Sequence, residues 1–150
     1  MGKIQLTQDG LVGLQKELET LQTTTRPSVV EKLQKARSMG DLKENNAYQS
    51  AREELGDLDG RILEIQHILK NAEVVEKKND GVVELGSTVV VEVDGQTKTF
   101  SIVGEYESDP LNGKLSATSP IGSALLGAKV GMSVSIQLPV GAKVYKVISL

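Results

Sequence analysis

The chain has 150 residues, with no cysteine, a single histidine and a formal net charge of −3. These features exclude disulfides, cysteine-based zinc sites and histidine-cluster metal sites, and they argue against a protein that binds duplex nucleic acid nonspecifically. No apolar stretch has the length of a signal peptide or of a membrane span, so we expect a soluble, cytoplasmic protein without membrane contact.

Charged residues are unevenly distributed between two halves of the chain. Residues 1–78 contain 12 Lys or Arg and 13 Asp or Glu, whereas residues 79–150 contain only 5 and 7 and are richer in glycine and β-branched residues. A chain of this length suits one domain or two small ones. We therefore predict a helical domain over residues 1–78 and a separate α+β domain over residues 79–150.

The first helical segment carries an apolar seam in two parts. The seam begins with Leu11, Leu14, Leu18 and Leu21, slips around residues 23–28, and resumes with Val29 or Val30, Leu33 and Ala36. Pro27 lies within the slip, where it should kink the helix or start a fresh turn capped by Thr25, and we expect a bend and not a break. From Asp9 to Met39 this arm would be about 45 Å long, so it should project from a small domain.

A second helical segment carries a longer seam. Its apolar residues alternate by four and three positions, as in a coiled coil: Ala51, Leu55, Leu58, Ile62, Ile65, Leu69 and Ala72. This seam needs a partner helix, and the first segment supplies one. We therefore predict an antiparallel coiled-coil hairpin. His67 falls between seam positions and is expected to be solvated.

The turn between the two arms, near residues 40–46, carries two carboxylates. Gly40 can end the first helix, Asp41 can be the N-cap of the second, and Glu44 then falls at N3 of a capping box. A second interpretation is that the two acids complete a metal site that belongs to another protein. The two interpretations are compatible, because a cap uses one oxygen of each carboxylate and leaves the other facing solvent.

Two arginines lie near the same end of the hairpin. Arg37 is one turn before the acids and Arg52 about two turns after them. Exposed arginines at such a position can donate charge-assisted hydrogen bonds to phosphates. They can equally be surface charges that pair with Glu53 or other neighbouring acids.

Three further residues are candidates for support of the tip. Tyr48 can pack beneath the tip and brace it, or it can stack on a base. Leu42 is an apolar residue at the turn, so it can contact a host protein or pack at the tip. We include Asn45 in this supporting set.

The second half of the chain begins with the pattern of an antiparallel hairpin. Val89, Val91 and Val93 alternate with polar residues, and Asp94-Gly95 is a hairpin-turn dipeptide. Phe100 and Ile102 continue the alternation on the return strand. A second hairpin is predicted from residues 134–138 and 142–148 around a turn at 139–141.

A short helix is predicted between these hairpins. Ser119 and Pro120 are a typical N-cap and first helical residue, residues 121–126 are mostly apolar, and Gly127 is a typical C′ residue. The segment from Gly122 to Lys129 is not a phosphate loop, since its lysine does not directly follow Gly127 and no Ser or Thr follows it. The predicted domain is therefore a sheet covered by one helix.

Two separated segments resemble one known family. Residues 40–52, and residues 119–127 with the following Val130-Gly131, are similar to the tip motif and to a C-terminal helix of the bacterial Gre transcript-cleavage factors, of the GreA type. The resemblance covers nearly the whole chain. Ala47 departs from it, since many members have an acidic residue there.

The resemblance implies an FKBP-like C-terminal fold and a role in transcription elongation. Members insert their coiled coil through the secondary channel of RNA polymerase and stimulate cleavage of backtracked RNA. Prolyl isomerase activity is not expected, because Phe100 is the only Phe and such pockets are lined by aromatic residues. A channel-binding regulator that does not cleave and a coiled-coil adaptor remain alternatives.

The resemblance also implies roles for the tip residues. Asp41 and Glu44 match the family's catalytic acids and would share a Mg²⁺ ion with the polymerase, without binding it stably alone. Arg37 and Arg52 match the basic patch and would contact the nascent RNA 3′ segment. We expect a monomeric accessory factor that donates catalytic groups to the polymerase and is not itself an enzyme.

Overall fold

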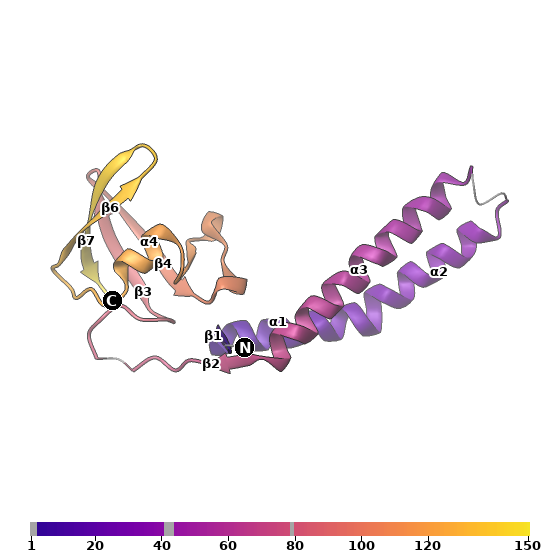
Figure 1. Ribbon diagram of the computed structural model, residues 1–150, viewed down its shortest axis with the longest axis horizontal. Coiled ribbons are helices and arrows are strands. Elements are labelled where there is room, and N and C mark those ends of the chain that lie inside the picture. Colours follow the sequence, from indigo (N-terminus) through magenta and orange to yellow (C-terminus); the bar gives the residue numbers. More distant parts are fainter. Residues whose placement is uncertain (1–2, 41–43, 79) are drawn as a thin grey trace. The chain divides into compact units, whose positions relative to one another are not determined.

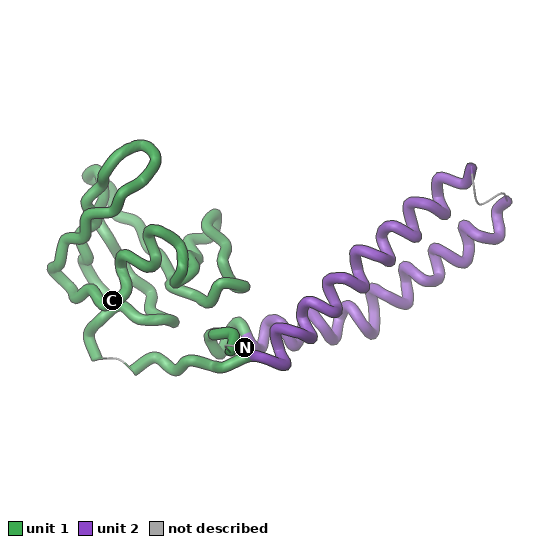
Figure 2. Tube along the Cα trace, in the orientation of Figure 1, with its two compact units in different colours: residues 1–10, 72–150 green, residues 11–71 purple. Residues whose placement is uncertain are grey.

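The computed structural model describes residues 3–40, 44–78 and 80–150. The chain forms two compact units, one of residues 11–71 and one that joins residues 1–10 to residues 72–150 (Figure 2). The first unit is a helical hairpin and the second contains the sheet. This is the predicted fold class of a helical hairpin followed by a small sheet domain.

The hairpin consists of one interrupted arm and one continuous arm. The first arm contains α1 (Gln8–Thr20), a π-helix (Leu21–Thr25) and α2 (Arg26–Arg37), and the chain returns through α3 (Asn46–Lys70). Helices α2 and α3 lie side by side (Figure 1). The first arm is helical without a break from Gln8 to Arg37, as predicted.

The π-helix explains why the apolar seam slips. The Arg26 N–H donates to the Leu21 carbonyl five residues earlier, so this turn holds one residue more than an α-helical turn. Leu21 and Val29 are accordingly eight positions apart rather than the seven of a heptad, and Val29 is buried while Val30 is only half-buried. Of the two predicted alternatives, Val29 therefore continues the seam.

The predicted Thr25 cap is wrong. Thr25 has helical backbone angles of φ −71° and ψ −49°, and its side chain makes no capping hydrogen bond. A cap is not needed because the helix does not restart. Pro27 instead lies in the first turn of α2, just beyond the widened π-turn.

The two arms bury a common apolar core. Val29, Leu58 and Ile62 are buried together, and Leu18, Leu21 and Leu55 pack against them. At the end of α3 the buried residue differs from the predicted one, since Ile68 is fully buried and the predicted seam residue Leu69 is only half-buried. Ala72 cannot continue the seam because α3 ends at Lys70. His67 is exposed, as predicted.

The second unit is built on a five-stranded sheet with the order β5-β4-β3-β7-β6. The strands are β3 (Thr88–Val93), β4 (Gln96–Val103), β5 (Lys114–Ser116), β6 (Ser133–Leu138) and β7 (Gly141–Ser149). The sheet is antiparallel except that β4 and β5 are parallel. The two predicted hairpins are antiparallel, but the FKBP-like antiparallel sheet expected from the resemblance gains a parallel edge at β5, which was not predicted.

The predicted turns and helix of this unit are confirmed. Asp94 and Gly95 both have positive φ, 53° and 74°, which defines the two-residue type I′ turn between β3 and β4. Helix α4 (Pro120–Leu125) has Ser119 as its N-cap, and the Ser119 hydroxyl accepts the Gly122 N–H at 3.0 Å. The last turn is shorter than predicted, because Gly141 already pairs with Leu138 as the first residue of β7.

One face of the sheet and α4 enclose the core of this unit. Its buried residues are Val83, Val89, Val91, Val93, Ile102, Leu115, Leu125, Ala128, Ile136, Tyr145 and Val147. Two 3₁₀ turns, Glu105–Glu107 and Pro110–Asn112, connect β4 to β5. Along the described residues, no helix is both long and apolar enough to cross a bilayer.

The first strand joins the sheet unit. β1 (Ile4–Leu6) pairs in parallel with β2 (Ala72–Val74), and neither strand was predicted. The Glu107 carboxylate accepts the Thr7 N–H at 2.9 Å and the Gly104 N–H at 3.1 Å. Gly104 must be glycine here, since a Cβ would lie 2.2 Å from the Gln5 carbonyl oxygen.

The compact units therefore divide the chain differently from the predicted domains. The sequence-based boundary follows the change of residue pattern after residue 78. The hydrogen bonds of Glu107 and the pairing of β1 with β2 instead place residues 1–10 and 72–78 in the sheet unit.

Candidate functional site at the hairpin tip

The candidate site is the turn between α2 and α3, at the end of the hairpin (Figure 1). Helix α2 ends at Arg37 with Ser38 as its C-cap, and α3 begins at Asn46. The described part of the turn includes Gly40 and Glu44. Two predicted site residues, Asp41 and Leu42, lie outside the described residues.

Glu44 does not occupy the predicted N3 position. Helix α3 begins at Asn46, so Glu44 lies before the N-cap and outside the helix. Its side chain is exposed. The capping-box interpretation is therefore wrong for Glu44. The expected C′ position of Gly40 is also shifted, since Gly40 follows the C-cap by two residues and has a φ of 134°.

Asn45 is the N-cap of α3. It has an extended backbone, with φ −89° and ψ 96°, and its Oδ1 accepts the Tyr48 N–H at 3.0 Å. The helix therefore starts without help from Glu44. This leaves both Glu44 carboxylate oxygens free of a capping role in α3.

The same Asn45 side chain also contacts the other arm. Its Nδ2 donates to the carbonyl oxygen of Ala36 at 2.6 Å. The Ala36 oxygen also accepts the Met39 N–H at 3.1 Å. The last carbonyls of a helix have no partner within the regular helix, and these two donors satisfy that of Ala36. Asn45 thus caps one helix and bonds to the end of the other, and its role in supporting the tip stays a prediction.

Small buried residues pack the arms together behind this bridge. Ala36 on α2 and Ala51 on α3 are 4% and 1% exposed, and both also line a pocket of about 350 Å³ between the helices. Tyr48 is half-buried. Its backbone N–H takes part in the cap, and the bracing and base-stacking roles of its side chain both stay predictions.

The two candidate RNA-binding arginines are exposed. Neither Arg37 nor Arg52 forms an ion pair with any residue that the structure describes, so the alternative pairing of Arg52 with Glu53 is not observed there. The neighbouring lysines differ, since Lys32 contacts Glu54 and Lys35 contacts Glu31, each at 3.1 Å.

The tip chemistry suits a hard cation that has other ligands. Mg²⁺ prefers carboxylate and water oxygens and is commonly held by one or two protein carboxylates. Glu44 offers one exposed carboxylate. Across residues 3–40, 44–78 and 80–150, no group of three or more metal-binding side chains is gathered in one place.

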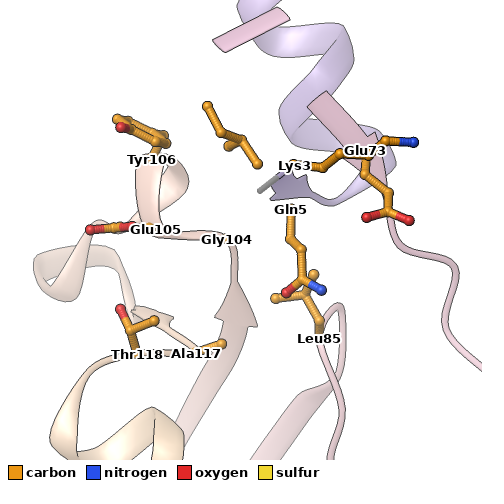
Figure 3. Close-up of a pocket in the computed structure, with 10 residues that line it drawn as sticks. Lys3, Gln5, Glu73, Leu85, Gly104, Glu105, Tyr106, Ala117 and Thr118 are labelled. Atoms are coloured by element: carbon orange, nitrogen blue, oxygen red, sulfur yellow. The ribbon is translucent and has the colours of Figure 1, made fainter. Parts of the chain in front are cut away.

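A pocket of about 310 Å³ lies in the sheet unit (Figure 3). Lys3, Gln5 and Glu73 line one side, and Glu105, Tyr106 and Thr118 line the other. Tyr106 is its single aromatic residue. This lining differs from the apolar, aromatic pocket that prolyl isomerase activity would need.

Comparisons with known proteins agree along the whole chain. Residues 4–74 match the family "Transcription elongation factor, N-terminal", and residues 77–150 match "Transcription elongation factor, GreA/GreB, C-term". The chain is 40% identical to Transcription elongation factor GreA of Thermomicrobium roseum over 99% of this chain and 97% of that protein. It is 44% identical to GreA of Listeria monocytogenes serotype 4a over 91% and 88%.

Solved structures of similar proteins carry related names. Thermus aquaticus Gfh1 is 28% identical, with a TM-score of 0.47 over 99% of this chain and 98% of that one. A GreA/GreB factor from Nitrosomonas europaea is 23% identical, with a TM-score of 0.42 over 98% of both chains. Because both domain families match in order and relatives of 40% identity span its length, the chain belongs to the GreA/GreB family of transcription elongation factors.

Proposed function

We propose that the protein inserts its helical hairpin into the secondary channel of RNA polymerase and stimulates Mg²⁺-dependent cleavage of backtracked nascent RNA. The observation that carries this proposal is the exposed Glu44 carboxylate at the hairpin tip. This carboxylate does not cap α3, because Asn45 does. Membership of the family supports the same activity.

The proposed contribution of the tip is to bring carboxylate oxygens to a metal site held mainly by the polymerase. Metal ions in such phosphodiester sites activate the attacking water and stabilise the leaving oxygen. Asp41 would help to hold the loosely bound ion. Glu44 would assist by coordination or by accepting a hydrogen bond from the attacking water, which orients that water toward the phosphate.

The arginines would position the RNA. Arg37 and Arg52 are exposed and keep their guanidinium groups free of described acids. A guanidinium can donate two parallel hydrogen bonds to a phosphate. In this role the two residues bind the RNA 3′ segment without reading its sequence.

The protein would then be an accessory factor and not a free-standing nuclease. It lends acidic groups to the active site of the polymerase, whose own acids hold the other metal ion. The coiled-coil adaptor alternative is less well supported, since the seam residues Val29, Leu58 and Ile62 are already buried within one chain. We therefore expect a monomer in solution, which analytical ultracentrifugation can check.

Adding the protein to halted polymerase that holds 5′-end-labelled RNA tests the proposal. Shortened labelled RNA and restored elongation are expected, in proportion to added protein. Inhibited synthesis with uncut RNA would contradict cleavage and would favour the non-cleaving regulator. Unchanged RNA and an unchanged elongation rate, at protein concentrations that saturate the polymerase, would contradict both functions.

A further inference from the structure

One amide side chain joins the two ends of the hairpin tip. Asn45 accepts the Tyr48 N–H at 3.0 Å through Oδ1 and donates to the Ala36 carbonyl at 2.6 Å through Nδ2. The first bond fixes where α3 begins, and the second fixes how far the end of α2 lies from that point. The end of α2 and the start of α3 are thereby joined by one side chain.

This double contact needs both halves of an amide. Aspartate has two acceptor oxygens, so it can accept the Tyr48 N–H but cannot donate to the Ala36 carbonyl. Serine also caps helices well, but its shorter side chain cannot serve both partners at once. Many residues can cap α3, whereas closing the tip in this way requires asparagine.

Glu44 is the residue most directly affected by this bridge. It is joined by one peptide bond to Asn45, whose backbone angles are fixed by the cap and by the contact with α2. Glu44 itself is exposed and outside the helix, so its position depends on how firmly Asn45 is held.

We propose that Asn45 is a positioning residue that holds the Glu44 carboxylate in the orientation needed to assist metal-dependent RNA cleavage. This inference rests on the proposed function. Loss of the Ala36 hydrogen bond would leave α3 capped but would free the base of the tip. Glu44 would then occupy the productive orientation for a smaller fraction of the time, and the cleavage rate would fall in proportion to that fraction.

The experiment compares Asn45→Ser and Asn45→Asp with the wild type. Both variants keep a good N-cap for α3 and lose the donor to Ala36, and they differ in charge, so an effect common to both does not come from added charge. Asn46→Ser is the matched control, because Asn46 is exposed at the first position of α3. Cleavage rate is measured at saturating factor over a range of Mg²⁺ concentrations, together with polymerase binding.

A second readout uses the free protein. Backbone ¹⁵N relaxation reports the order parameter of the Glu44 amide. Rigid backbone has an order parameter near about 0.85 and flexible backbone falls below about 0.6. This measurement does not depend on cleavage and distinguishes a loosened tip from a changed metal site.

We expect both Asn45 variants to cleave about tenfold more slowly at saturating factor, the effect of losing about one hydrogen bond. They should also need more Mg²⁺ for half-maximal rate and should show a lower Glu44 order parameter. Polymerase affinity should stay within about twofold of wild type. Asn46→Ser should match the wild type in every measurement.

Wild-type cleavage by both Asn45 variants would overturn the inference. So would a slower rate that recovers fully at saturating factor, because the role would then be structural only. An unchanged Glu44 order parameter would also overturn it. Failure of the wild type itself to stimulate cleavage would instead overturn the proposed function, and this inference with it.

Discussion

Arg61 on α3 holds the Glu17 carboxylate on α1 through two hydrogen bonds. Nε contacts Oε2 at 2.6 Å and Nη2 contacts Oε1 at 2.9 Å, and a third contact joins Nη1 to Glu64 at 2.7 Å. Arg26 and Asp59 form a similar pair between the arms at 2.8 Å. Bidentate ion pairs thus connect both parts of the first arm to α3.

These pairs predict how stability depends on pH. The hydrogen bonds from Arg61 lower the pKa of Glu17, and those from Arg26 lower the pKa of Asp59. A carboxyl group whose pKa is lower in the folded state stabilises the fold above its unfolded pKa and loses that contribution as pH falls through the folded value. Stability should therefore begin to fall below about pH 4.3, the ordinary pKa of glutamate.

Thermal unfolding followed by circular dichroism from pH 7 to pH 3 checks this. Glu17→Gln should be less stable at pH 7 by at most about 1 kcal/mol, since both side chains are partly exposed, and its melting temperature should change less with acid. If the melting temperatures of the wild type and Glu17→Gln fell equally between pH 7 and pH 3, the assigned role of the Glu17–Arg61 pair would be contradicted.

The π-helix predicts an unusual response to deletion. Removing the exposed Thr24 would restore seven-residue spacing between Leu21 and Val29, but it would place Pro27 in the interior of a regular helix. Proline there costs about 3 kcal/mol. We expect the deletion to destabilise the hairpin by about that amount, and Pro27→Ala in the same chain to recover most of the loss.

Deletion of Gly60 is the control for removing one exposed helical residue. Gly60 is exposed, as Thr24 is, but it lies between the buried residues Leu58 and Ile62. Removing it rotates these residues onto different faces, so the hairpin should not fold. Urea unfolding gives the free energies. If Pro27→Ala fails to rescue the Thr24 deletion, the π-turn does not serve to accommodate the proline.

The apolar seam predicts unequal effects of two similar substitutions on α3. Ile65 is fully buried, whereas Leu63 is 66% exposed. Ile65→Ala should lower the free energy of unfolding by about 2 to 5 kcal/mol, and Leu63→Ala should change it by less than about 0.5 kcal/mol. Equal effects in urea unfolding would mean that the seam is assigned to the wrong face.

The sequence predicts the long elements well because each repeats one signal many times. Three heptads specify α3, and the slip at residues 23–28 indicates an irregularity in the first arm but not that it is a π-helix. Asp94-Gly95 predicts its turn because both residues tolerate positive φ. Strands β1, β2 and β5 have three residues each, too few to show a period, and β1 and β2 lie on either side of the hairpin in the sequence.

The tip shows a different limit of sequence analysis. Asp41 and Glu44 have the spacing of a capping box, and Asn45 is an equally good N-cap three residues before Tyr48. Local preference does not separate these two starts of α3. The carbonyl of Ala36 favours the second, because it accepts the Asn45 Nδ2–H from the opposite arm. The sequence alone does not reveal that contact.

Substitution of the tip acids tests the central claim most directly. The rate of RNA cleavage in backtracked polymerase complexes is measured with Glu44→Gln and Asp41→Asn at saturating factor and fixed Mg²⁺. Because Asn45 caps α3, Glu44→Gln should leave stability and polymerase binding unchanged. We predict that each variant cleaves about 10²-fold more slowly. Wild-type rates from bound, folded variants would contradict a catalytic role for the tip.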